Sequence, residues 1–139
     1  MGVIGPGDEP SVAAAEVGRL VAERGAVLVC GGRGGAMEAA CRGAKEAGGL
    51  TVGILPDADR SAANPFVDVV LPTGLGEARN ALVVRAADVL IAVGGGYGTL
   101  SEIALALKVG KRVIGLGTWE IEGVVATEGP EAAVAAALA

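Results

Sequence analysis

The residues best suited to chemistry lie in the segment VLIAVGGGYGTLSEIALALKVGKRV, which runs from residue 89 to residue 113. An apolar run ends there in a glycine-rich turn formed by Gly94, Gly95, Gly96 and Gly98. Glycine lets backbone amides approach an anion closely, and the N-terminus of a following helix adds partial positive charge. The turn therefore predicts a phosphate site, yet a carboxylate, Glu102, follows it by one helical turn.

Two interpretations of that carboxylate are open. The letters TLSE match a capping box, in which Thr99 caps the helix and Glu102 reaches back to its backbone amide. The residues alone favour this structural interpretation. The alternative is catalytic, because cleavage of a bond between a sugar and a nitrogen base builds positive charge that a carboxylate stabilises while it orients a water molecule.

Several classes of function are excluded by what the sequence lacks. It contains no histidine, which removes Ser-His-Asp and Cys-His nucleophilic systems and the usual histidine metal sites. A formal net charge of -5 provides no basic field for nucleic acid or an anionic membrane. The aromatic residues are only Phe66, Tyr97 and Trp119, which predict no stacking platform for single-stranded nucleic acid.

The sequence also predicts where the protein resides and the state of its thiols. No apolar stretch approaches the roughly 20 residues of a membrane-spanning helix, and the N-terminus lacks the pattern of a signal peptide. We therefore expect a cytoplasmic protein. Cys30 and Cys41 lack the close spacing of zinc or redox motifs, so we expect buried free thiols.

Short apolar runs alternate with alanine-rich helical patterns along the whole chain. The runs predict strands at 2–7, 26–32, 50–56, 67–72, 89–95 and 112–117, the last strand of the chain. The helical patterns cover 11–25, 34–49, 76–88, 99–110 and 128–139. Strands that are apolar throughout are typical of sheets covered on both faces. We predict an α/β fold: one Rossmann-like, doubly wound parallel sheet in a single three-layer domain spanning residues 1–139.

Three glycine-rich turns follow predicted strands, so all three should lie at the carboxyl edge of the sheet, where such folds bind ligands. They contain Gly5 and Gly7; Gly31, Gly32, Gly34 and Gly35; and the turn from Gly94 to Gly98. The first is no complete dinucleotide fingerprint, and no P-loop sequence exists. Arg33, within the second turn, is either a phosphate clamp or a solvated arginine.

The segments GGGYGTLSE, GEARNALVVRAADVLIAV and CGGRGGAMEAACRGAKEAGGLTVGILP together resemble the LOG-like family, long called possible lysine decarboxylases, whose pattern is PGGxGTxxE. The resemblance covers roughly residues 1–117. It implies a dimeric, Rossmann-type phosphoribohydrolase that cleaves a nucleoside 5'-monophosphate into a free base and ribose 5-phosphate. It implies no cofactor and no metal.

Carried over by position, the resemblance makes Arg79 and Glu102 the catalytic pair. The ligand-binding residues would be Gly94, Gly95, Gly96, Gly98, Thr99, Gly32 and Gly35. Arg79 also stands out by itself, because a cation in the first turn of a helix is disfavoured by the helix dipole. An external anion or Glu102 would explain its position.

The chain departs from the family pattern at three positions. Gly94 replaces the leading proline, Asn80 replaces the lysine that follows the family's arginine, and Val83 replaces the methionine three residues further on. The triple glycine is similar to a short branch that includes the molybdenum cofactor carrier proteins, which bind a phosphorylated pterin without converting it. Two hypotheses follow: an N-glycosidic hydrolase, slightly favoured by the sequence, and a non-catalytic carrier or sensor of a phosphorylated ligand.

The predicted partner is thus a small phosphorylated molecule, a nucleoside monophosphate or a pterin, and neither nucleic acid nor a membrane. The helices predicted at 76–88 and 99–110 are more apolar than one covered face requires. A homodimer or higher homo-oligomer built on these helices is therefore expected, with the site close to the interface.

Overall fold

The structure is a computed structural model that describes residues 1–139. Seven strands and five α-helices follow one another along the chain: β1 (Gly2–Ile4), α1 (Val12–Glu23), β2 (Leu28–Cys30), α2 (Ala36–Glu46), β3 (Thr51–Leu55), β4 (Val69–Pro72), α3 (Asn80–Ala86), β5 (Val89–Val93), α4 (Tyr97–Lys108), β6 (Arg112–Leu116), β7 (Val124–Thr127) and α5 (Pro130–Leu138). Two short 3-10 helices, η1 (Arg60–Ala62) and η2 (Gly76–Arg79), precede β4 and α3.

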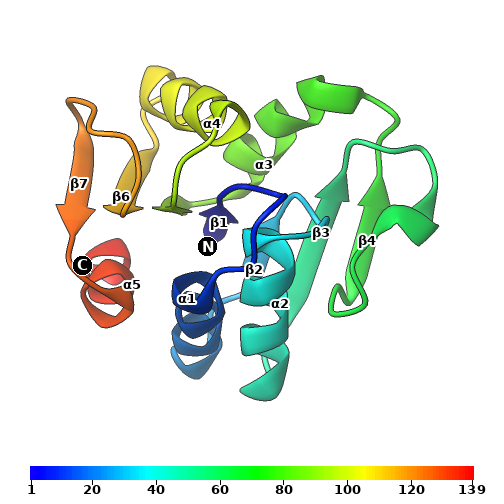
Figure 1. Cartoon of the computed structure of the whole chain (residues 1–139), viewed down its shortest axis with the longest axis horizontal. Helices are drawn as coiled ribbons and strands as arrows, with labels where there is room; N and C mark the ends of the chain where they lie inside the picture. The colour runs from blue at the N-terminus through cyan, green and yellow to red at the C-terminus, as the bar shows by residue number, and fades with distance from the viewer.

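The strands form one sheet in the order β4-β3-β2-β1-β5-β6-β7, and every neighbouring pair is parallel. The central strand β1 pairs with β2 on one side and with β5 on the other. The strand order therefore reverses at β1, which makes the carboxyl ends of β1 and β5 the topological switch point. This arrangement confirms the predicted doubly wound, Rossmann-like fold (Figure 1).

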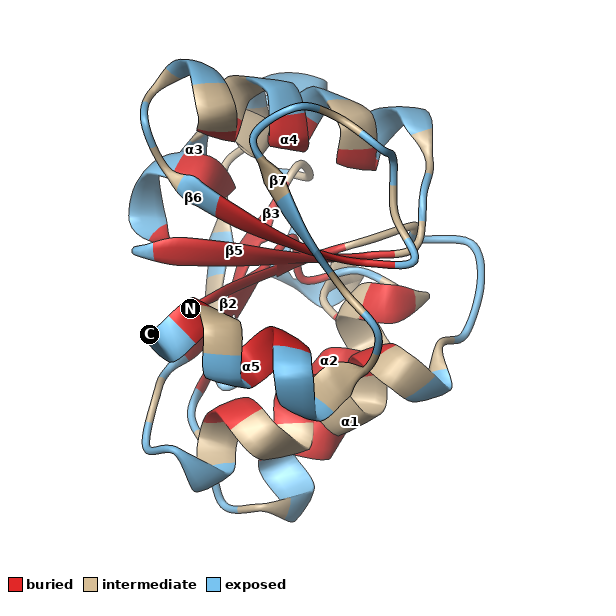
Figure 2. Ribbon diagram, turned by 90° about the vertical axis from the view of Figure 1, so that its left-hand side faces the viewer, coloured by how far each residue is buried: buried red, intermediate tan, exposed pale blue.

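Helices cover both faces of the sheet, which gives three layers (Figure 2). The layer of α1, α2 and α5 encloses the larger cluster of buried side chains, and the layer of α3 and α4 encloses the smaller one. Every residue of β5 is buried, because this strand lies in the middle of the sheet between the two layers. Its uniformly apolar sequence, VLIAV, is thus explained by burial on both faces.

One strand was missed by the sequence prediction, which ended the sheet at β6. The strand β7, with the sequence VVAT, pairs with β6 alone and leaves Val125 half-exposed. It is a four-residue edge strand beside an acidic segment, so its apolar pattern is too short to stand out. The predicted helix at 76–88 is also split: residues 76–79 form η2, and α3 begins at Asn80.

Other local predictions agree with the structure. Pro130 is the first residue of α5, where its fixed φ suits the first helical turn. Cys30 and Cys41 are buried free thiols whose sulfur atoms lie 3.5 Å apart. None of the helices is both long enough and apolar enough to cross a bilayer.

Candidate functional site

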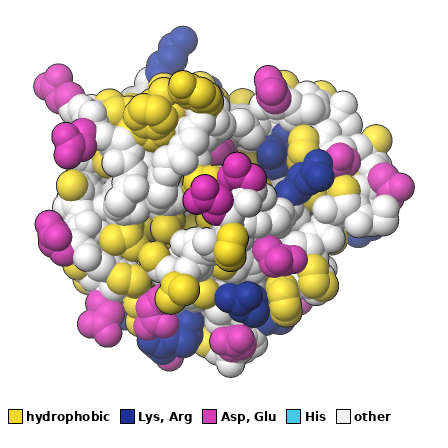
Figure 3. Space-filling model, viewed as in Figure 1, with side chains coloured by type: hydrophobic (Ala, Val, Ile, Leu, Met, Phe, Trp, Pro, Cys, Tyr) yellow, Lys and Arg dark blue, Asp and Glu magenta, His cyan; other side chains and the backbone are white.

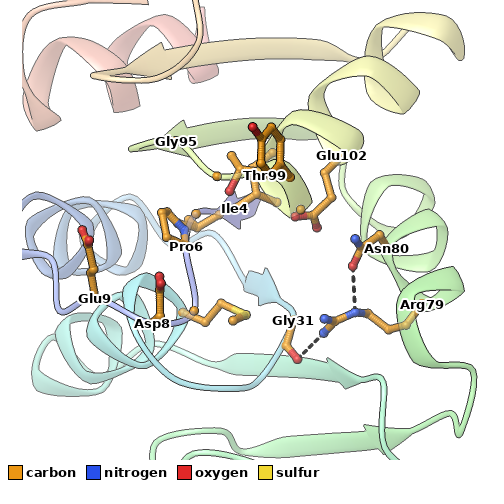
Figure 4. A pocket seen from close by; sticks show the side chains of 17 residues that line it. Ile4, Pro6, Asp8, Glu9, Gly31, Arg79, Asn80, Gly95, Thr99 and Glu102 are labelled. Carbon is orange, nitrogen blue, oxygen red and sulfur yellow. Dashed lines mark hydrogen bonds between the residues drawn. The ribbon is translucent and has the colours of Figure 1, made fainter.

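A polar cavity of about 370 Å³ lies at the switch point of the sheet. Segments from five parts of the chain form its walls: β1 with the turn after it, the start of the turn after β2, Met37 of α2, the junction of η2 and α3, and the turn after β5 with the first residues of α4. Its lining includes Arg79, Glu102 and Thr99, so the structure brings these three predicted site residues together (Figure 4).

The glycines after β5 differ in their relation to the cavity. Gly95, Gly96 and Gly98 line it, whereas Gly94 does not. A methyl group added to Gly98 would meet no atom within 4 Å, and one added to Gly96 would meet nothing closer than 3.8 Å. Neither has a positive φ. The fold itself therefore does not require glycine at these two positions.

The glycines after β2 have a different role. Gly32 and Gly35, both predicted to bind ligand, lie outside the lining of the cavity. Each has a positive φ, +78° and +60°, and an added methyl group would lie 2.9 Å from Leu55 and 2.4 Å from the carbonyl oxygen of Pro6, respectively. These two glycines are required by backbone conformation and close packing.

Thr99 does not cap α4, so the favoured capping-box interpretation was wrong. The helix begins two residues earlier, at Tyr97, and its N-cap is Gly96, which makes no side-chain capping bond. Thr99 lies in the first turn, almost fully buried, and its hydroxyl oxygen has no hydrogen-bond partner. A buried hydroxyl without a partner is rare, and here it belongs to a residue that lines the cavity.

Glu102 lies one turn further along α4 and is only 9% exposed. Burial raises the pKa of its carboxyl group to about 7, and the positive charge of Arg79 opposes part of that rise. The carboxyl group makes no capping hydrogen bond, because α4 begins at Tyr97 and its N-cap is Gly96. Near neutral pH the group is therefore divided between its neutral and ionised forms.

Arg79 is held in place by the backbone around it. Its Nη1 atom donates hydrogen bonds to the carbonyl oxygens of Gly31 and Ile54, the latter at 2.8 Å, and its Nε atom donates to Asn80 Oδ1 at 3.0 Å (Figure 4). It forms no ion pair with Glu102; the four ion pairs of the structure lie elsewhere. Burial lowers the pKa of Arg79, while Glu102 opposes the shift, so the two groups share one electrostatic environment.

Sequence reasoning missed Asp8 and Glu9, which follow Gly7 and line the cavity opposite Arg79 (Figure 4). Their position in the glycine-containing turn after β1 was the feature of the sequence that could have indicated them. They give the cavity an acidic side and a basic side. Arg33, the candidate phosphate clamp, instead pairs with Asp57 at 3.2 Å and does not line the cavity.

The surface around the cavity shows no large field of one charge. On the face drawn in Figure 3, acidic and basic side chains are interspersed among polar and apolar ones. No group of three or more acidic or cysteine side chains has the geometry of a metal site. An anionic ligand would therefore be held by local groups.

The fold and this site define a class: a doubly wound α/β protein with a small-molecule cavity at its switch point. Within that class, the chain belongs to the SLOG cluster4 family, whose model matches residues 1–137. This match confirms the resemblance to LOG-like proteins.

Relatives among curated proteins differ in how fully they match. An uncharacterized protein of Archaeoglobus fulgidus is 51% identical over 138 residues, which are 96% of this chain and 91% of that protein. The cytokinin riboside 5'-monophosphate phosphoribohydrolase of Mycobacterium tuberculosis is 38% identical over 93 residues, 65% of this chain and 50% of that protein. A probable rice enzyme of the same name is 37% identical over 103 residues, 70% of this chain. The chain spans only 42% of the rice enzyme's length.

Solved structures match nearly the whole chain. The molybdenum cofactor binding protein from Rippkaea orientalis superposes with a TM-score of 0.91 at 42% identity, covering 97% of this chain and 92% of that one. The molybdenum cofactor carrier protein from Chlamydomonas reinhardtii superposes with a TM-score of 0.88 at 40% identity and the same coverage. The short branch indicated by the triple glycine is thus supported.

Proposed function

We propose that this protein binds a small phosphorylated heterocyclic ligand in the switch-point cavity and carries it without cleaving it. The observation that supports this proposal most is the open glycine turn of Gly95, Gly96 and Gly98. These residues line the cavity, and Gly96 and Gly98 have neither a strained φ nor a neighbour that would exclude a side chain. Close approach of a ligand to the backbone explains glycine there.

The phosphate would lie at the first turn of α4. The first amides of a helix have no partner within the helix, and the helix dipole adds positive potential at the same place. The buried hydroxyl of Thr99, which has no partner in the protein, would donate to a phosphate oxygen. Arg79, on the facing wall, supplies the cationic side chain of the cavity.

The position of Glu102 fits an anionic ligand because of its protonation. A carboxyl group with a pKa of about 7 is neutral in a large part of the population at neutral pH. A neutral carboxyl group does not repel a phosphate and can donate one hydrogen bond to it. Binding of an anion close by would raise this pKa further, so phosphate binding and proton uptake would be coupled.

Two observations favour carriage over cleavage. The neighbours that match 97% of the chain at 40% and 42% identity are described as carrying or binding the molybdenum cofactor. The chain also has Asn80 beside Arg79, where the hydrolase pattern has lysine. The Asn80 side chain accepts a hydrogen bond from Arg79 Nε and so orients the guanidinium group.

A second candidate is the phosphoribohydrolase activity, and Glu102 is the observation that favours it. A pKa near 7 suits a group that must both give and take a proton at neutral pH. In this case Glu102 would stabilise positive charge on the ribose ring and orient the attacking water. Two relatives described as phosphoribohydrolases also match 70% and 65% of the chain at 37% and 38% identity.

A binding and turnover experiment separates the candidates. Guanosine 5'-monophosphate, adenosine 5'-monophosphate, their nucleosides and inorganic phosphate are titrated by calorimetry, and release of free base is followed by chromatography. A carrier binds the phosphorylated compounds, not the nucleosides, and releases no base. Protein expressed in a host that makes the molybdenum cofactor would then carry a phosphorylated pterin, identified by mass spectrometry. Base release that falls roughly a hundredfold in Glu102→Gln would instead establish the hydrolase.

A further inference from the structure

The chain has only three aromatic residues, and two of them, Tyr97 and Trp119, stack on each other beside the glycine turn after β5. Tyr97 is the first residue of α4 and lines the cavity, and Trp119 lies in the connection between β6 and β7. Their ring centroids are 6.1 Å apart with an angle of 28° between the ring planes. Hydrophobic side chains gather over this region, near α4 and the β6–β7 connection (Figure 3).

Trp119 is fixed against the glycine turn. Its indole nitrogen donates a hydrogen bond to the carbonyl oxygen of Gly96 at 3.1 Å. The same nitrogen lies 3.4 Å from the place where a side chain on Gly95 would begin. The indole therefore packs on one side of the turn and supports the Tyr97 ring, which stacks on it.

Tyr97 is nevertheless 85% exposed, whereas Trp119 is 37% exposed. An aromatic ring gains stability when it is buried, so the packing of this chain does not account for a tyrosine left open. The ring stacks on Trp119, and most of the Tyr97 side chain is exposed beside the cavity that it lines. Tyr97 also lies between Gly96 and Gly98 in the sequence of the glycine turn. A ligand whose phosphate lies against the turn could therefore place an aromatic ring of its own against the ring of Tyr97.

We infer that Tyr97, supported by Trp119, is a stacking platform for the flat heteroaromatic ring of the ligand whose phosphate lies on the glycine turn. This inference rests on the proposed binding function and specifies its ligand. The site selects phosphate esters that bear a ring, purine or pterin, over sugar phosphates without one. Stacking is tolerant of ring identity because every such heterocycle has a π-face.

The test compares guanosine 5'-monophosphate with ribose 5-phosphate, which shares the sugar phosphate but has no ring. Affinities are measured by calorimetry, and the fluorescence of Trp119, the only tryptophan, is followed in parallel. The wild type should bind the nucleotide roughly tenfold more tightly than the sugar phosphate, which corresponds to the range of one stacked base. Only the nucleotide should quench the fluorescence of Trp119.

Variants at position 97 isolate the ring. Tyr97→Leu keeps an apolar side chain but removes the π-face, so the tenfold preference should disappear while affinity for ribose 5-phosphate stays unchanged. Tyr97→Phe should keep the preference. Val12→Ala, at an 89% exposed position on α1, is the control for loss of an exposed apolar group and should change neither affinity.

Each other outcome has a defined meaning. If neither compound binds, the proposed function fails and the platform fails with it. If both bind with equal affinity, or if Tyr97→Leu weakens both equally, phosphate binding stands and the platform is wrong. If Tyr97→Leu leaves both affinities unchanged and alters the sedimentation of the protein, the ring is a contact between copies of the chain, which also overturns the inference.

Discussion

The glycine turn after β2 and the glycine turn after β5 have similar compositions but different surroundings. In the first, Gly32 and Gly35 have positive φ angles, and backbone or side-chain atoms occupy the space beside them. In the second, Gly96 and Gly98 have ordinary backbone angles and open space that faces the cavity. One turn uses glycine to close the fold, and the other leaves its backbone accessible.

This difference shows which glycines a ligand explains and which the fold explains. A glycine needed for packing reveals itself by an obstructed methyl position or a positive φ, and such a residue says nothing about a ligand. Where a glycine at the rim of a cavity has neither property, nothing within the fold requires glycine at that position. The two turns can therefore be separated experimentally, by comparing effects on stability with effects on binding.

The largest effect on stability is expected for Gly35→Ala. The new methyl group would lie 2.4 Å from the carbonyl oxygen of Pro6, and alanine would adopt a φ of +60°. Steric overlap and the left-handed conformation together should lower the free energy of unfolding by roughly 3 kcal/mol. Urea unfolding measures this change. A loss below about 1 kcal/mol would show that the turn after β2 is as open as the turn after β5.

The next effect has the opposite sign and depends on pH. Glu102 has a pKa of about 7 in the folded protein against 4.5 for an unperturbed group, so the folded state holds its proton more tightly than the unfolded state. Stability from this group is complete below pH 4.5 and is lost as pH rises toward about 7. Glu102→Gln should therefore be as stable as wild type at low pH and roughly 3 kcal/mol more stable above neutral pH.

Unfolding of both proteins across this pH range tests that expectation, because groups other than Glu102 titrate alike in the two and cancel in the difference. The exposed Glu77, on η2, provides the control: the difference in stability between Glu77→Gln and wild type should not grow between acid and neutral pH as the difference for Glu102→Gln does. Parallel curves for Glu102→Gln and wild type would mean that Glu102 has the same pKa in the folded and unfolded states and is therefore ionised at neutral pH. The proposal that a neutral Glu102 carboxyl group donates a hydrogen bond to the phosphate would then be wrong.

An intermediate effect is expected for Arg79→Lys, which tests the wall opposite the open turn. The guanidinium group donates to Gly31 and Ile54 carbonyl oxygens and to Asn80, and an ammonium group cannot reach all three acceptors in this geometry. An unpaired buried carbonyl should lower the free energy of unfolding by about 1–2 kcal/mol. Arg85→Lys, at an exposed position on α3, is the matched control. If the two variants have the same free energy of unfolding, the hydrogen bonds of Arg79 do not stabilise the fold.

The sequence predicted the sheet well because each buried strand has an unambiguous pattern. β5 is an apolar run of five residues, and β6 is buried throughout after the exposed Arg112; both strands are found where they were predicted. β7 was missed because it is an edge strand of four residues with two exposed positions. Periodicity reports burial, so an element that is barely buried leaves little signal.

The site was predicted in part, for a related reason. The turn after β5 was indicated because it follows a strand end in a parallel sheet, whereas Arg79 and Glu102 were indicated by the resemblance to LOG-like proteins. The letters TLSE could not show that α4 begins at Tyr97, which places Thr99 and Glu102 inside the helix instead of at its cap. The burial of Glu102 and the stack of Tyr97 on Trp119 depend on segments distant in sequence, so no local pattern contained them.

The smallest effect on stability is expected for Gly98→Ala, and this variant tests the comparison of the turns most sharply. Residue 98 lies in the first turn of α4, with an ordinary φ and nothing within 4 Å of the new methyl group, so the helix should gain up to about 0.5–1 kcal/mol. The methyl group would project where the ligand meets the backbone, so affinity for guanosine 5'-monophosphate should fall roughly tenfold.

Gly129→Ala supplies its control, since Gly129 precedes α5, also has open space around it and lies outside the cavity. Unfolding and calorimetry on both variants therefore give two independent readings of one added methyl group. A stable Gly98→Ala variant with weakened binding is expected only if the turn after β5 is open for a ligand. If the variant binds as tightly as wild type, the ligand does not contact the backbone of the turn, and a ligand does not explain why glycine occurs there. If it is instead destabilised as much as Gly35→Ala, the fold requires glycine in both turns. The turn after β5 then gives no evidence of a ligand.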